Sequence, residues 1–63
     1  MSSPTVCVII AAYNVERTIA RAVASALREP EVREVVVVDD ASSDGTAARA
    51  ADADDGSGRL RVL

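Results

Sequence analysis

A chain of 63 residues with a formal net charge of -3 has room for one small domain or for part of one. Its hydrophobic content of 49% is that of a folded protein and argues against disorder. The seven cationic residues are all arginines, and they are scattered, which argues against a nucleic-acid-binding surface. The absence of lysine excludes a P-loop from this segment, and the absence of histidine excludes a Ser-His-Asp triad and His-ligated metal sites.

Cys7 is the only cysteine, so neither an internal disulfide nor a cysteine-rich zinc site can form. Its place in an apolar run favours a buried, unreactive thiol. No apolar stretch approaches the roughly 20 residues of a membrane span, and the amino terminus lacks the basic start and apolar core of a signal peptide. These features predict a location in the cytoplasm or at the inner face of the membrane.

The first part of the chain is expected to form a strand and a helix. Residues 6–10 are a continuous apolar run, which predicts a first buried strand. Asn14 then suits a helix N-cap, with Glu16 in the first turn, where a carboxylate complements the helix dipole. Pro30 ends this helix, because it disfavours the α conformation at the preceding residue. One apolar helical face is expected at Ile19, Ala22, Val23, Ala26 and Leu27.

A second strand, expected from about residue 34, ends in two carboxylates. The valines at 35–38 run into Asp39 and Asp40, and small polar residues follow. This pattern predicts a strand buried on both faces and then a polar loop that opens a helix. Ser43 can cap that helix, which is expected over 44–53, and 59–63 predicts a third strand.

The alternation of strands and helices predicts an α/β fold with a parallel sheet and right-handed crossovers. We expect the strand order 3-2-1 and both helices on one face of the sheet. The first two strands are apolar at every position, so both of their faces require cover. Since soluble monomers avoid a large exposed apolar patch, we expect an incomplete domain that needs the rest of a larger domain to cover the sheet.

Adjacent parallel strands bring their carboxyl ends together, and ligands of open α/β sheets bind there. The first loop would supply small residues, the ring of Tyr13 and the amide of Asn14, and the second would supply Asp39 and Asp40. The second helix would add free backbone N–H groups. A carboxylate can accept a hydrogen bond from a base or a ribose, and a tyrosine can stack on a base. The residues therefore suit a nucleotide pocket, although acids at a strand end can also merely solvate a loop.

Two segments resemble the signatures of family 2 glycosyltransferases of the GT-A fold. Residues 6–16 are similar to the family's opening, an apolar strand followed by Pro-Ala-Tyr-Asn-Glu-Glu, and 35–46 resembles Val-Val-Asp-Asp-Gly-Ser-Thr-Asp-Gly-Thr. Ala11 stands where the family usually has proline. Ala41 stands where it has glycine, so a positive φ there would be strained. The resemblance covers nearly all of the chain and implies a Rossmann-like half of a GT-A fold.

By this resemblance, the protein is a glycosyltransferase that transfers a sugar from a nucleotide-diphosphate donor to an acceptor hydroxyl by direct displacement. Asp40 would bind the base, often uracil, which favours a UDP-sugar, and Asp39 would support the loop or reach the ribose. The catalytic base and the ligands of Mg²⁺ or Mn²⁺ would lie beyond Leu63. The implied nucleotide-sugar site comprises Ala11, Ala12, Tyr13, Asn14, Glu16, Asp39 and Asp40.

Asp52 and Asp54 match the Asp-x-Asp pattern with which that family holds its metal. They precede the third strand, however, at the sheet edge opposite the expected pocket. We therefore interpret them as a solvated loop and expect no metal site in this segment.

Two alternatives remain open. A truncated, non-catalytic nucleotide-binding fragment would share these sequence features, and only the full reading frame separates it from an enzyme. A receiver-like signalling domain also has paired aspartates after an apolar strand. Receivers place that pair after the first strand and carry a late lysine, whereas this chain has the pair after the second strand and has no lysine.

Overall fold

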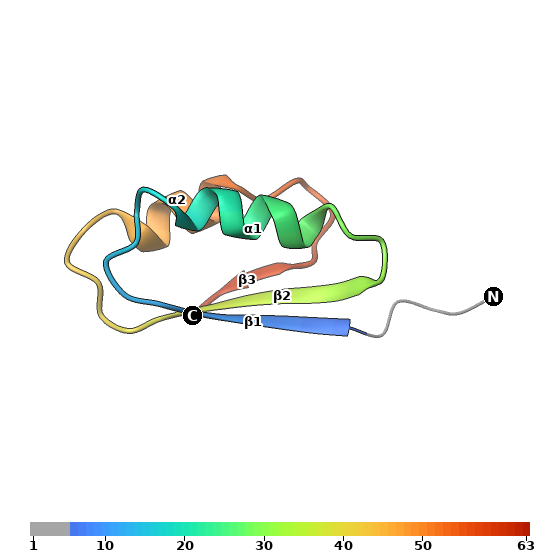
Figure 1. The fold of residues 1–63 in the computed structure, drawn as a ribbon, viewed down its shortest axis with the longest axis horizontal. Coiled ribbons are helices and arrows are strands. Elements are labelled where there is room, and N and C mark those ends of the chain that lie inside the picture. The colour runs from blue at the N-terminus through green and yellow to red at the C-terminus, as the bar shows by residue number, and fades with distance from the viewer. Residues whose placement is uncertain (1–5) are drawn as a thin grey trace.

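The computed structural model describes residues 6–63. A three-stranded parallel sheet in the order β1-β2-β3 carries two helices on one of its faces (Figure 1). This arrangement confirms the predicted α/β class, strand order and placement of both helices. The elements are β1 (Val6–Ala12), α1 (Ile19–Leu27), β2 (Val32–Asp39), α2 (Thr46–Asp52) and β3 (Leu60–Val62).

Both helices begin later than predicted. The N-cap of α1 is Thr18, and Asn14 precedes it with a φ of 51°, so the predicted Asn14 cap is wrong and Glu16 lies before the helix. The N-cap of α2 is Gly45 rather than Ser43. Asn14 and Ser43 hydrogen-bond to each other instead, because the two loops that carry them lie side by side.

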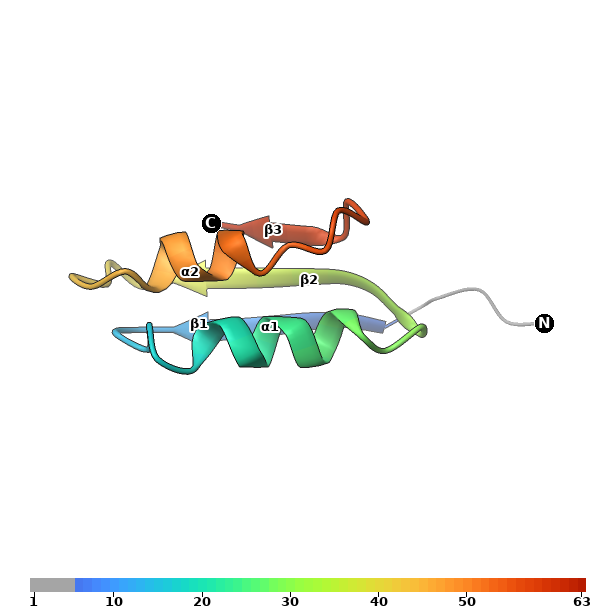
Figure 2. The same ribbon diagram turned by 90° about the horizontal axis from the view of Figure 1, so that it is seen from above.

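The core lies between the helices and the covered face of the sheet. Ile19, Val23 and Leu27 recur once per helical turn of α1 and are buried, as predicted. Ala22, which was predicted on the same face, is exposed. From below, Val35 and Val37 of β2 meet them and are fully buried, because alternate strand residues point to the same face. Seen from above, α2 lies over β2 and β3, with α1 beside it over the rest of the sheet (Figure 2). Each such side chain contributes about 1.5–3 kcal/mol of burial free energy.

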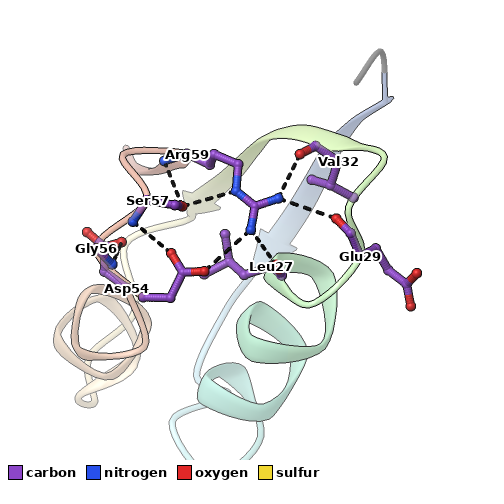
Figure 3. Close-up of polar contacts among 8 residues, drawn as sticks. Leu27, Glu29, Val32, Asp54, Gly56, Ser57 and Arg59 are labelled. Atoms are coloured by element: carbon purple, nitrogen blue, oxygen red, sulfur yellow. Dashed lines mark hydrogen bonds and ion pairs between the residues drawn. The ribbon is translucent and has the colours of Figure 1, made fainter. Parts of the chain in front are cut away.

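Arg59 ties the loop before β3 to the end of α1. Its guanidinium donates to the carbonyl oxygens of Leu27, of Glu29 at 3.3 Å and of Val32 at 2.8 Å (Figure 3). Its Nε donates to the Ser57 hydroxyl at 3.0 Å. The last carbonyls of a helix have no partner within the helix, and a guanidinium has five donors in a fixed plane. Arg59 therefore caps α1 and fixes it to the start of β2.

The face without helices is apolar, as predicted. Ile9 is 70% exposed and lies beside Val36 in the sheet register. Val38 is 40% exposed and lies beside Ala11. Neither helix within residues 6–63 has the length and hydropathy of a membrane span.

The predicted burial of Cys7 is wrong, because its side chain belongs to this uncovered face. Cys7 is exposed, and its sulfur lies 4.0 Å from the carboxylate of Glu34 on the neighbouring strand. Glu34 also pairs with Arg61 of β3 at 3.5 Å. Charged groups thus flank the apolar patch toward the amino ends of the strands.

We predict that Arg59→Ala lowers the free energy of unfolding by about 1.5–3 kcal/mol, because the change leaves three carbonyl groups without their charged donor. Arg61→Ala is the matched control. Its exposed ion pair should contribute less than about 1 kcal/mol. Urea unfolding followed by far-ultraviolet circular dichroism at one protein concentration measures both. Equal effects of the two substitutions would contradict the capping role of Arg59.

We also predict that the 63-residue chain self-associates through the uncovered sheet face. Ile9→Thr combined with Val38→Thr should shift it toward the monomer, because threonine keeps the strand preference while removing apolar surface. Ala20→Thr combined with Ala48→Thr, on exposed helix positions, is the control. Size-exclusion chromatography with hydrogen exchange measures the outcome. A monodisperse wild-type monomer with protected strand amides would contradict this prediction.

Candidate functional site

The carboxyl ends of β1 and β2 lie side by side and carry the predicted site. Ala11 and Ala12 belong to β1, which extends two residues beyond the predicted strand, and Ala12 pairs with Asp39 in the parallel register. The backbone N–H of Asp40 donates to the carbonyl of Ala12 at 2.9 Å. The β1–α1 and β2–α2 loops therefore start from adjacent points on one sheet edge, as predicted (Figure 1).

Tyr13 and Asp40 are the first residues beyond this paired end. Tyr13 is 61% exposed, and Asp40 is exposed as well. Within residues 6–63, no hydrogen bond or ion pair engages the Asp40 carboxylate. This edge therefore presents an aromatic ring and a carboxylate to solvent, on residues that directly follow the last paired positions of β1 and β2.

Asp39 differs from Asp40 because its carboxylate is engaged within the loop. Its Oδ1 accepts a hydrogen bond from the Ser42 hydroxyl and another from the Ser42 N–H at 3.4 Å. Ala41 lies between these two residues and has a φ of 55°. This is the positive φ that was expected from the sequence to be strained in an alanine. The left-handed conformation costs a residue with a Cβ roughly 1–2 kcal/mol. The Asp39–Ser42 contacts help to hold the chain in this tight turn.

Asn14 joins the two loops rather than capping a helix. Its N–H donates to the Ser42 hydroxyl at 2.8 Å, and its side-chain oxygen accepts the N–H of Ser43 at 2.9 Å. Asparagine tolerates the left-handed region better than most residues, which suits its φ of 51°. The residue was predicted in the site, and the structure places it as a bridge between the loops.

Glu16 forms a second bridge. Its carboxylate accepts the N–H of Gly45 at 3.2 Å, while its own N–H donates to the Asp44 carboxylate at 3.3 Å. A Cβ at position 45 would lie 2.9 Å from that Glu16 oxygen. Since Gly45 has a φ of -84°, any residue could adopt its φ, and the glycine is suited to the close approach of Glu16 instead.

Thr46 and Asp44 form a third bridge, which the sequence interpretation missed. Thr46 is fully buried, and its hydroxyl accepts the N–H of Val15 at 2.9 Å while donating to Asp44 Oδ1. The same carboxylate oxygen accepts the Thr46 N–H at 3.0 Å. The Thr46 hydroxyl is the main cause of a lowered pKa at Asp44, and the N–H groups of Thr46 and Glu16 add to it. An Asp-Gly-Thr spacing is typical of a local turn, but a helix was predicted here from the sequence, and the spacing carries no signal for a contact with the other loop.

The start of α2 offers fewer free N–H groups than predicted. Those of Ser43, Gly45 and Thr46 already donate to side-chain oxygens. These backbone N–H groups therefore already have hydrogen-bond partners within the two loops. The side chains at the paired strand ends, Tyr13 and Asp40, remain exposed.

Two cavities lie beside this edge, on the helix side. One, of about 260 Å³, is lined by 14–18 and Asp44, and a second, of about 460 Å³, by Glu16, Arg17, Ala20 and Arg49. Neither includes Tyr13 or Asp40. Tyr13 and Asp40 therefore lie on the exposed surface, outside both cavities.

The Asp52 and Asp54 pair lies at the opposite edge, as predicted. Asp52 ends α2, and the Asp54 carboxylate accepts the N–H of Gly56 at 3.1 Å in the loop that leads to β3. Arg59 at the end of this loop contacts the start of β2, which marks it as the amino edge of the sheet. Across residues 6–63 no group of three or more His, Cys, Asp or Glu side chains is arranged to hold a metal ion.

A family model described as glycosyl transferase family 2 matches residues 7–63. The chain belongs to this family. The predicted membership is thereby confirmed, and the match argues against the receiver-like alternative. The matched range includes the paired ends of β1 and β2, with Tyr13 and Asp40.

Two curated relatives come from Rhizobium meliloti (strain 1021). The succinoglycan biosynthesis protein ExoU is 62% identical over 63 residues, which cover 98% of this chain and 18% of that protein. The succinoglycan biosynthesis protein ExoO is 49% identical over 61 residues, covering 95% and 18% respectively. This family 2 chain thus spans 18% of the length of either relative. No solved structure matches it significantly.

We predict that Ala41→Gly raises the free energy of unfolding by about 0.5–1 kcal/mol, because it removes the left-handed strain at a smaller entropic cost. Ala48→Gly, on the exposed side of α2, is the matched control. It should lower the same quantity by about 0.5–1 kcal/mol, as glycine does within helices. Urea unfolding of both variants gives the comparison. A loss at both positions would show that Ala41 is unstrained.

Proposed function

We propose that this chain forms the donor-nucleotide site of a glycosyltransferase. The enzyme would bind a nucleotide-diphosphate sugar and transfer the sugar to an acceptor hydroxyl, with release of the nucleoside diphosphate. The observation that carries the proposal is the exposed pair of Tyr13 and Asp40 at the carboxyl edge of the sheet, where α/β folds bind ligands. Family 2 membership supports glycosyl transfer as the chemistry.

The chemistry of this pair favours a uracil base. An ionised carboxylate only accepts hydrogen bonds, so Asp40 requires a base that presents an N–H group. Uracil has such a group at N3, within the ring and between its two carbonyls, whereas cytosine has an acceptor at that ring position and presents N–H groups only at its exocyclic N4. Tyr13 can pack its ring against either base. We therefore propose a UDP-sugar as donor and place the discrimination at Asp40.

The surrounding residues divide between support and contact. Ala11 is small and exposed, which lets a ligand approach the strand end, whereas the side chain of Ala12, predicted in the site, is buried in the core. Asp39, engaged by Ser42, supports the turn that presents Asp40. Asn14 and Glu16 would act mainly by holding the first loop against the second, since their side chains already bind N–H groups there.

The divalent metal that the family resemblance implies does not fit the residues described here. Asp52 and Asp54 lie at the wrong sheet edge, and no other suitable cluster occurs within 6–63. We propose that the ligands of Mg²⁺ or Mn²⁺, and the catalytic base, lie outside this range. The proposed location is the cytoplasm or the inner face of the membrane, where nucleotide sugars are available.

The test is UDP binding by the protein expressed from its full reading frame. We predict that Asp40→Ala weakens UDP binding about tenfold to a hundredfold, the equivalent of about 1.5–3 kcal/mol for a hydrogen bond to a charged group. Asp39→Ala should cost less, because that carboxylate faces its own loop. CDP should bind more weakly than UDP to the wild type, and Asp40→Ala should narrow that difference. Isothermal titration calorimetry measures each Kd.

Asp52→Ala is the control, since it removes a carboxylate from the opposite edge and should leave the Kd for UDP unchanged. Equal losses for Asp39→Ala and Asp40→Ala would refute the assignment of the base contact. Release of UDP from a UDP-sugar, measured in the presence of Mn²⁺, separates an enzyme from a fragment that only binds nucleotide.

A further inference from the structure

The Thr46 hydroxyl lies in a chain of hydrogen bonds whose direction is fixed. A hydroxyl has one hydrogen to donate and two lone pairs with which to accept. The N–H of Val15 can only donate, so the Thr46 oxygen must accept it, at 2.9 Å. The hydroxyl hydrogen is then directed to Asp44 Oδ1. Because Thr46 is fully buried, water cannot replace either partner without opening the structure.

Asp44 gathers donors from both loops onto one carboxylate. Its Oδ1 accepts the hydroxyl and the N–H of Thr46, which belong to its own loop. Its Oδ2 accepts the N–H of Glu16 at 3.3 Å, which belongs to the other loop. Only a side chain whose two terminal atoms both accept hydrogen bonds, such as a carboxylate, satisfies these donors. An asparagine would turn an NH₂ group toward one of them. The lowered pKa of Asp44 agrees with this set of donors.

These hydrogen bonds hold the part of the β1–α1 loop that follows Tyr13. Val15 and Glu16, whose N–H groups are held, follow Tyr13 and Asn14 along the β1–α1 loop. Asp44, in turn, lies in the loop that begins with Asp40. The distance between the ring of Tyr13 and the carboxylate of Asp40 therefore depends on how firmly the two loops are joined.

We infer that Asp44 is a positioning residue, which orients the Thr46 hydroxyl and holds the Glu16 N–H so that Tyr13 and Asp40 face one ligand. This inference rests on the nucleotide site proposed above. If the loops separate part of the time, the apparent Kd rises in inverse proportion to the fraction of molecules in which they are joined. A bound nucleotide would restore the joined state at saturation.

The experiment compares isosteric changes along this chain in the protein expressed from its full reading frame. Asp44→Asn and Thr46→Val should each raise the Kd for UDP about tenfold, an effect of about 1.4 kcal/mol. Thr46→Ser, which keeps the hydroxyl, should bind UDP like the wild type. The double variant Asp44→Asn with Thr46→Val should lose little more than either single variant, because both break one chain of bonds.

Asp55→Asn is a matched control. Asp55 also begins an Asp-Gly-Ser turn, in which it accepts the N–H of Ser57 at 3.0 Å, and the Ser57 side chain lowers its pKa. It lies at the opposite sheet edge, so its replacement should not change the Kd for UDP. The comparison removes the effect of losing one carboxylate from an Asp-Gly turn.

Two readouts separate positioning from a loss of folded protein. Irreversibly misfolded protein would lower the number of UDP sites per molecule at an unchanged Kd, whereas poor positioning raises the Kd at full stoichiometry. In turnover, KM for the donor should rise about tenfold while kcat at saturating donor stays near the wild-type value. A wild-type Kd in Asp44→Asn, or a Thr46→Ser variant as impaired as Thr46→Val, would overturn the inference. Wild-type protein that binds no nucleoside diphosphate would refute the proposed function, and this inference with it.

Discussion

The parallel pairing of β1 with β2 is the constraint on which the rest of the site depends. The pairing ends at Ala12 and Asp39, and the N–H of Asp40 adds a final bond across the end. Parallel neighbours require a crossover, which α1 supplies. Both loops therefore leave the same edge, so residues such as Asn14 and Ser42, 28 positions apart, can hydrogen-bond. A slip of one residue in this register would turn the apolar side chains of the strand to the other face.

The same backbone conformation occurs just beyond each exposed side chain of the site. Tyr13 is followed by Asn14 with a φ of 51°, and Asp40 by Ala41 with a φ of 55°. A left-handed residue turns the chain sharply, so each loop bends away directly after presenting one side chain. The contacts that follow, Asn14 with Ser43 and Asp39 with Ser42, stabilise these turns. Strain of this kind persists where the surrounding structure holds it, which is common in binding loops.

The strands and their order could be predicted from sequence, because continuous valine and isoleucine runs and the β-α-β alternation leave few alternatives. The helix caps could not. Asn14 and Ser43 fit local capping rules worth about 1 kcal/mol each, but both side chains find partners across the loops. Cys7 was misplaced because an apolar run does not say which of its residues face a covered side. Bonds between distant residues, such as Val15 with Thr46, have no signal in a single sequence.

The two Asp-Gly turns of this chain show why local pattern alone does not assign function. In both, an aspartate accepts the N–H of the hydroxyl residue two positions later, Thr46 in one case and Ser57 in the other. The turn at Asp44 stands beside the β1–α1 loop, so its second oxygen meets Glu16. The turn at Asp55 stands at the amino edge, where its second oxygen meets Arg59 at 3.4 Å and adds to the cap on α1. The sheet topology thus places one turn at the edge of the proposed site and makes the other part of the support for a helix.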